Sequence, residues 1–103
     1  MRILTLAGVL GLALAGAASA QTSGASLTLA NAAASPASPV IIDGISWRCE
    51  TTGACIGVGR GEEQPATRAC RRVVARVGAV SAFTWRGTAL SSDQLAACNT
   101  AAA

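Results

Sequence analysis

Four cysteines, at positions 49, 55, 70 and 98, constrain the fold of this 103-residue chain more than any other feature. They fall within residues 40–99, a stretch that carries only fifteen large apolar side chains. A domain this small rarely builds a sufficient core without covalent links. We therefore predict that residues 40–99 form one domain held together by two disulfides.

The N-terminal segment predicts export. Arg2 precedes an uncharged apolar run over residues 3–15, and an A-x-A cleavage pattern ends at Ala20. The run is too short for a comfortable transmembrane helix, although an uncleaved membrane anchor is the alternative. We predict a signal peptide over residues 1–20 and a periplasmic or secreted mature chain, in an oxidising compartment where disulfides persist.

Residues 21–39 follow the predicted signal peptide and carry no charge and no aromatic side chain. Two prolines stand there among many Ala and Ser residues. Such a composition has too few bulky side chains to offset the entropy of ordering. We interpret this segment as a flexible leader, with a short strand at residues 26–29 as the alternative on local β-propensity.

The first half of the domain predicts a β-meander. Asp43-Gly44 lies between two apolar runs, which is a strong hairpin signal. The hairpin would pair residues 40–42 with residues 45–49. A five-residue turn then leads to a third strand near residues 55–58.

The second half of the domain predicts a helix, a strand and a short helix. Apolar residues recur at helical spacing over residues 66–77, after a proline at position 65 that suits a first helical turn. Residues 81–86 alternate as in a strand. Ser91 begins a capping box, so a last helix starts there and frays into residues 100–103. The predicted class is therefore a small disulfide-stapled α+β domain.

Four cysteines allow three disulfide pairings. We favour Cys49–Cys55, across one tight turn, and Cys70–Cys98, between the inward faces of the two predicted helices. The second link closes the longer loop and contributes about 3–4 kcal/mol in the loop-entropy account. The sequence leaves the other two pairings open.

The composition excludes most familiar catalytic machinery. The chain has no His, Lys or Tyr, so every basic side chain is an Arg, which does not titrate at ordinary pH. No histidine-dependent triad or imidazole metal ligand exists, and the cysteine spacing does not suit zinc. We predict that the protein is not an enzyme and that it binds no metal and no cofactor.

Four arginines on the predicted first helix are the candidate binding site. They are Arg68, Arg71, Arg72 and Arg76. Like charges four residues apart on a helix repel, which makes this stripe unusual. We predict an anion-binding stripe for an acidic envelope protein, a lipid headgroup or a polysaccharide. The alternative is a solvated outer face whose arginines pair with Glu50 or Asp93.

Nucleic acid is not an expected partner. Without Arg2, seven arginines stand against five acids, which is a small excess of positive charge. Trp47-Arg48 and Trp85-Arg86 repeat a dipeptide on two predicted strands. We interpret them as core anchors beside outward arginines, with a surface Trp-Arg binding patch as the alternative.

A set of short motifs resembles a group of small exported bacterial proteins of unknown function. The motifs are Trp47-Arg48-Cys49, Cys55, Ala69-Cys70-Arg71, Phe83-Thr84, Leu95 and Cys98-Asn99. The resemblance covers residues 40–99 and leaves out the leader. It implies an exported domain with no assigned activity and transfers no catalytic residue.

The leading functional hypothesis is a non-catalytic exported protein that binds another macromolecule or contributes to the cell envelope. Two alternatives use the predicted hairpin. One is thiol–disulfide exchange by Cys49 and Cys55. The other is an inhibitor-like module that presents residues 50–54 to a protease.

Overall fold

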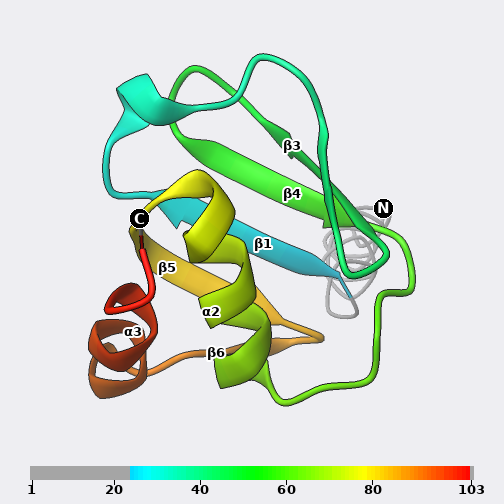
Figure 1. The fold of residues 1–103 in the computed structure, drawn as a ribbon, viewed down its shortest axis with the longest axis vertical. Helices are drawn as coiled ribbons and strands as arrows, with labels where there is room; N and C mark the ends of the chain where they lie inside the picture. Colours follow the sequence, from blue (N-terminus) through cyan, green and yellow to red (C-terminus); the bar gives the residue numbers. More distant parts are fainter. Residues whose placement is uncertain (1–23, 103) are drawn as a thin grey trace, which may run out of the picture.

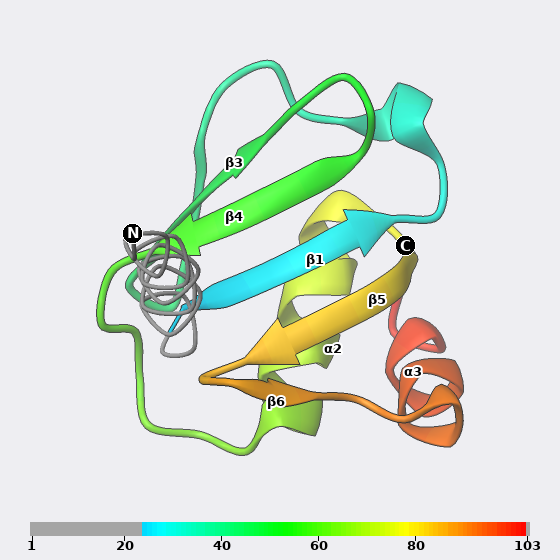
Figure 2. The ribbon, with the colours of Figure 1, turned by 180° about the vertical axis from the view of Figure 1, so that it is seen from behind.

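The computed structural model describes residues 24–102 of the chain (Figure 1). The predicted signal peptide lies outside these residues. Six strands form one antiparallel sheet in the order β2-β3-β4-β1-β5-β6. Helix α2 lies across one face of this sheet, and α3 packs beside α2 (Figures 1 and 2). The fold is α+β, as predicted.

The elements follow one another as strands and helices of modest length. They are β1 Ala25–Leu29, the 3-10 helix η2 Ala32–Ala34, β2 Val40–Ile42, β3 Ile45–Cys49, β4 Ala54–Val58, α2 Ala66–Val77, β5 Val80–Trp85, β6 Thr88–Ala89 and α3 Ser92–Asn99. Among the residues that the structure describes, no helix is long and apolar enough to cross a membrane.

Strand β1 corrects the predicted flexible leader. It lies between β4 and β5, inside the sheet, so residues 25–29 belong to the domain and the alternative of a strand at residues 26–29 is the observed one. Buried Ala25, Leu27 and Leu29 alternate with exposed Ser26 and Thr28. The local composition is misleading here because the two strands that pair with β1 come from far along the sequence.

The predicted meander of β2, β3 and β4 is confirmed. Asp43 and Gly44 both have left-handed backbone angles, with φ of 49° and 84°, as the tightest hairpin turns require. The register then places Cys49 directly opposite Cys55, and these two residues form one disulfide. The second disulfide, Cys70–Cys98, links α2 to α3. Both pairings are those favoured from the sequence.

The predicted capping box at the start of α3 is also confirmed. The backbone N–H of Gln94 donates to Ser91 Oγ at 3.2 Å, and that of Ser91 donates to Gln94 Oε1 at 2.8 Å. The chain after α3 differs from the predicted frayed tail. Ala101 and Ala102 are partly buried against the core, and their N–H groups donate to the carbonyls of Cys98 and Asn99.

The core fills the space between the sheet and the helix layer. Trp47 and Phe83 are each 1% exposed, and their ring centroids are 6.0 Å apart. Trp85 is 5% exposed and stacks on Phe83. Both tryptophans are therefore core anchors, and the alternative of a surface Trp-Arg patch is wrong.

Candidate functional site

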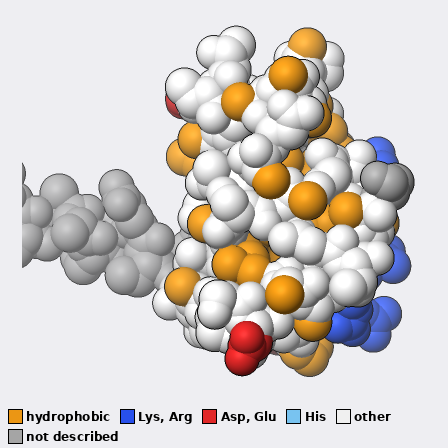
Figure 3. Space-filling view, turned by 90° about the vertical axis from the view of Figure 1, so that its left-hand side faces the viewer, with side chains coloured by type: hydrophobic (Ala, Val, Ile, Leu, Met, Phe, Trp, Pro, Cys, Tyr) orange, Lys and Arg blue, Asp and Glu red, His pale blue; other side chains and the backbone are white. Residues whose placement is uncertain are grey.

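Helix α2 has an apolar face toward the sheet and a charged face toward solvent. The inward positions are Ala69, Cys70, Val73, Val74 and Val77, all buried. This 3.6-residue pattern leaves the intervening positions outside, and the structure places all four predicted arginines there, exposed. In the edge-on view of Figure 3, arginine side chains gather along the right-hand edge, on the side of the helix layer.

One of the four arginines is engaged within the domain. Arg72 donates two hydrogen bonds to the carboxylate of Asp43, Nε to Oδ2 at 2.6 Å and Nη2 to Oδ1 at 2.8 Å. Gln64 Nε2 donates to the same Oδ2 at 3.3 Å. The partner of Arg72 is therefore the acid in the β2–β3 turn, and neither Glu50 nor Asp93, the alternatives from the sequence.

The electrostatics of this pair follow from its geometry. The Asp43 side chain is only 9% exposed, whereas that of Arg72 is 51% exposed. The hydrogen bonds from Arg72 lower the pKa of Asp43, although burial opposes them, and Arg68 lowers it further through space. The carboxylate reciprocally raises the pKa of Arg72. The pair fastens α2 to the β2–β3 turn.

The other three arginines keep their charges available. Within residues 24–102, no ion pair and no side-chain hydrogen bond engages Arg68, Arg71 or Arg76. We call these three residues the arginine face. The arginine face therefore presents three positive charges to solvent with no acidic partner among the described residues.

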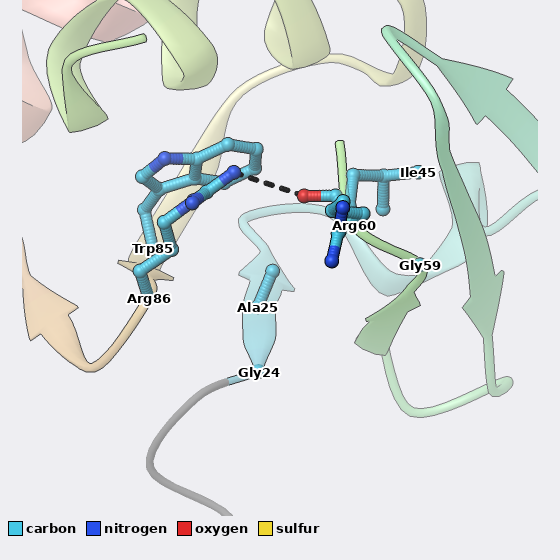
Figure 4. Close-up of a pocket in the computed structure, with 7 residues that line it drawn as sticks. All are labelled: Gly24, Ala25, Ile45, Gly59, Arg60, Trp85 and Arg86. Carbon is cyan, nitrogen blue, oxygen red and sulfur yellow. Dashed lines mark hydrogen bonds between the residues drawn. The ribbon is translucent and has the colours of Figure 1, made fainter. Parts of the chain in front are cut away.

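A small depression of about 180 Å³ lies between the end of β5, the start of β1 and the residues that follow β4 (Figure 4). The guanidinium of Arg86 lies 5.5 Å from the centre of the Trp85 ring. Its Nη2 donates to the carbonyl oxygen of Arg60 at 2.9 Å, and its Nη1 lies 3.3 Å from Glu63 Oε2. Among the described residues, the titratable side chains that line the depression are those of Arg60 and Arg86.

In the hairpin that the two alternative functions use, Glu50, Thr51, Thr52 and Ala54 are exposed, whereas Gly53 and Cys55, which hold the turn, are buried. Cys55 is 1% exposed and Cys49 is partly buried. In the turn between them Gly53 is buried, and its carbonyl accepts a hydrogen bond from the N–H of Leu29 at 2.8 Å. The turn is thus fastened to the end of β1 rather than projecting freely.

The sequence reasoning missed one surface altogether. The face of the sheet opposite the helices carries Ile41, Ile56 and Val58, which are 68%, 60% and 61% exposed. A signal for it existed, because β4 reads Ala-Cys-Ile-Gly-Val and has no polar side chain on either face. Such a strand is typical of a sheet that is covered on both sides.

Fold and site together define a small α+β domain that two disulfides stabilise, with an arginine face on its helix and a bare, partly apolar sheet face opposite. The sequence model of a family of unknown function, DUF8200, matches residues 9–100. The chain belongs to this family, and the match includes the β1 strand that the resemblance at residues 40–99 left out. No curated protein and no solved structure matches the chain.

Proposed function

We propose that this protein is an exported, non-catalytic domain that binds an anionic macromolecule of the cell envelope through the arginine face. The observation that carries the proposal is the set of three exposed, unpaired guanidinium groups on one helix. Two disulfides support an oxidising compartment, and the apolar run before Ala20 supports export.

The shape of the arginine face favours a ligand with repeated negative charges. Arg68 and Arg71 are three residues apart and Arg76 lies further along the same helix. Helical rise is about 1.5 Å per residue, so the three cations extend over roughly 12 Å. A polysaccharide, an acidic protein segment or a layer of lipid headgroups presents carboxylates or phosphates over such a distance. Guanidinium groups bind both kinds of anion through paired N–H donors.

The test compares two variants of equal charge. The triple variant Arg68→Gln, Arg71→Gln and Arg76→Gln removes the arginine face and leaves Arg72 with Asp43. The control variant, Arg60→Glu with Thr51→Glu, changes the net charge by the same amount on other surfaces, at two exposed side chains that form no hydrogen bond within residues 24–102. Binding would be measured to an acidic polysaccharide, to polyglutamate and to vesicles with anionic lipid, at several salt concentrations.

We expect the triple variant to bind its anionic probe roughly tenfold more weakly than the control variant, since exposed charge pairs are individually weak but additive. Salt should weaken the binding of the unmodified protein as it screens the charges. Equal binding by both variants would remove the arginine face as the site. If the protein binds none of the three probes, the proposed function itself is contradicted.

The two hairpin functions receive less support from the described contacts. Cys55 is almost fully buried and Cys49 is partly buried against the core, so an incoming thiolate has little access to this disulfide. We therefore propose a structural role for this disulfide and expect a reduction potential below about −300 mV. A strongly oxidising potential would favour exchange. Slowing of an envelope protease by the purified protein would favour the inhibitor-like alternative.

A further inference from the structure

The bare face of the sheet has the composition of a contact surface. Figure 2 shows this face, with the strands in front and α2 behind them. One-sided antiparallel sheets usually place polar side chains toward water. Here Ile41, Ile56 and Val58 are exposed, and they are the exposed large hydrophobic residues found within residues 24–102. All three lie on this one face, since each alternates with a residue that points into the core.

Strand register places the side chains of this face in two central rows. One row runs across the strands from Arg48 through Ile56 and Ser26 to Thr84. The neighbouring row consists of Glu50, Ala54, Thr28 and Ala82, in the same strand order. Arg48, Glu50, Ala54, Ile56 and Val58 line one shallow depression of about 380 Å³, so they share the face.

These two rows are complementary to each other. At three of the four positions, a cation in the first row corresponds to an anion in the second, a large apolar residue to a small one, and a hydroxyl to a hydroxyl, whereas the fourth pair, Thr84 with Ala82, places a hydroxyl against a methyl group. The corresponding pairs are Arg48 with Glu50, Ile56 with Ala54, and Ser26 with Thr28. Neither Arg48 nor Glu50 forms an ion pair within the described part of the chain. A surface whose two halves match in this way is complementary to itself under a two-fold rotation.

We propose that the bare face binds a second copy of this chain, about a two-fold axis that runs across the strands between Arg48 and Glu50. The rotation places Arg48 of each copy against Glu50 of the other. It also places Ile56 of each copy against Ala54 of the other, so that large side chains meet small ones. The paired sheets would pack face to face with nearly aligned strands, as in a β-sandwich.

The available area makes this a weak, concentration-dependent dimer. Four strands of five or six residues form the contact region. At strand spacings of about 4.8 Å and a rise of about 3.4 Å per residue, the two copies would bury on the order of 1,000 Å² of surface. Interfaces of this size lie at the lower limit for specific association.

The dimer would determine the directions in which the two arginine faces point. The dimer proposal itself does not rest on the proposed function. Because the sheets meet in the middle, α2 of each copy lies on the outside. The two arginine faces then point in opposite directions. Such a dimer could link two separate anionic molecules, but it gains no affinity from effective concentration on one flat surface, because both faces cannot contact that surface at once.

The test is sedimentation velocity on the full gene product, purified as the host processes it, over a wide concentration range. Arg48→Glu and Glu50→Arg each bring like charges together across the axis, and we expect each to weaken dimerisation at least tenfold. The double variant Arg48→Glu with Glu50→Arg restores opposite charges and has the same net charge as the unmodified protein. We expect it to dimerise within about threefold of the unmodified protein.

Two isoleucine variants test the position of the axis. Ile56 lies beside the axis, so Ile56→Asp should weaken dimerisation at least tenfold. Ile41 lies on the edge strand, outside the two rows, so Ile41→Asp should change dimerisation less than about threefold. Both side chains are mostly exposed, so circular dichroism should show an unchanged fold. A monomer at all concentrations up to about 1 mM would overturn the proposal. Failure of the charge-swapped double variant to dimerise, or equal effects of the two isoleucine variants, would also overturn it.

Discussion

The two faces of the sheet show how differently one short sequence uses its apolar residues. The face toward α2 and α3 holds both tryptophans and the single phenylalanine, all buried, and the helices above it are joined by Cys70–Cys98. The opposite face holds exposed isoleucine, valine, alanine, serine and threonine side chains. The first face therefore forms the core of the domain, whereas the second is exposed and is the surface proposed above to bind a second copy. Variants on the two faces should separate these roles.

The largest expected difference lies within β1, between adjacent residues on opposite faces. Leu27→Asp buries a charge in the core and should destabilise the fold by more than about 4 kcal/mol, enough to prevent folding of a small domain. Thr28→Asp places the same side chain on the exposed face and should cost less than about 1 kcal/mol. Urea unfolding followed by tryptophan fluorescence measures both. Equal losses would mean that β1 is not a core strand.

The two disulfides allow the stabilisation of the helix layer to be compared with that of the sheet. Replacement of Cys70 and Cys98 by Ala opens a loop with a sequence separation of 28, and that of Cys49 and Cys55 opens one of 6. The loop-entropy account gives losses of about 3.5 and about 2.5 kcal/mol, respectively. Thermal unfolding of the two double variants shows directly which disulfide contributes more to stability. If replacement of Cys49 and Cys55 caused the greater loss of stability, the hairpin disulfide would stabilise the fold by something other than loop closure.

A smaller effect is expected from the ion pair that fastens α2 to the β2–β3 turn. Asp43→Asn keeps a turn-forming Asn-Gly pair and removes the charge that Arg72 binds, so it should lower the melting temperature by a few degrees at neutral pH.

The pH dependence of this effect has a definite sign. The folded-state pKa of Asp43 is lowered from 3.8, so the stabilisation is fully present above that pH and is lost as pH falls toward the folded-state value. The difference between the unmodified protein and the variant should therefore be constant near neutrality and should shrink below about pH 4. A difference that grows on acidification would contradict the assigned pair.

The predictable parts of the fold are those that short sequence segments specify. Asp43-Gly44 determines the first hairpin, Ser91 and Gln94 determine the start of α3, and helical periodicity determines α2. Both disulfides follow once these elements are known, because register and helix faces bring the correct sulfur atoms together.

The unpredicted parts depend on contacts between distant segments. Strand β1 acquires its place from β4 and β5, and no feature of residues 21–39 reports those partners. Asp43 and Arg72 are 29 residues apart, so local charge spacing gave no sign of their pairing. Strand β6 follows a turn at Arg86-Gly87 with left-handed backbone angles, for which Arg is an unusual residue.

We expect the arginine face to bind anions and the bare sheet face not to bind them. A titration of the ¹⁵N-labelled protein with an acidic polysaccharide, polyglutamate and anionic lipid, followed by amide chemical shifts, locates the contact residue by residue. We expect the largest shifts around Arg68, Arg71 and Arg76, and much smaller shifts at the same ligand concentration in the variant that lacks these three charges. Shifts centred on β3 and β4, or shifts in the variant equal to those in the unmodified protein, would contradict the assignment of the arginine face as the binding site.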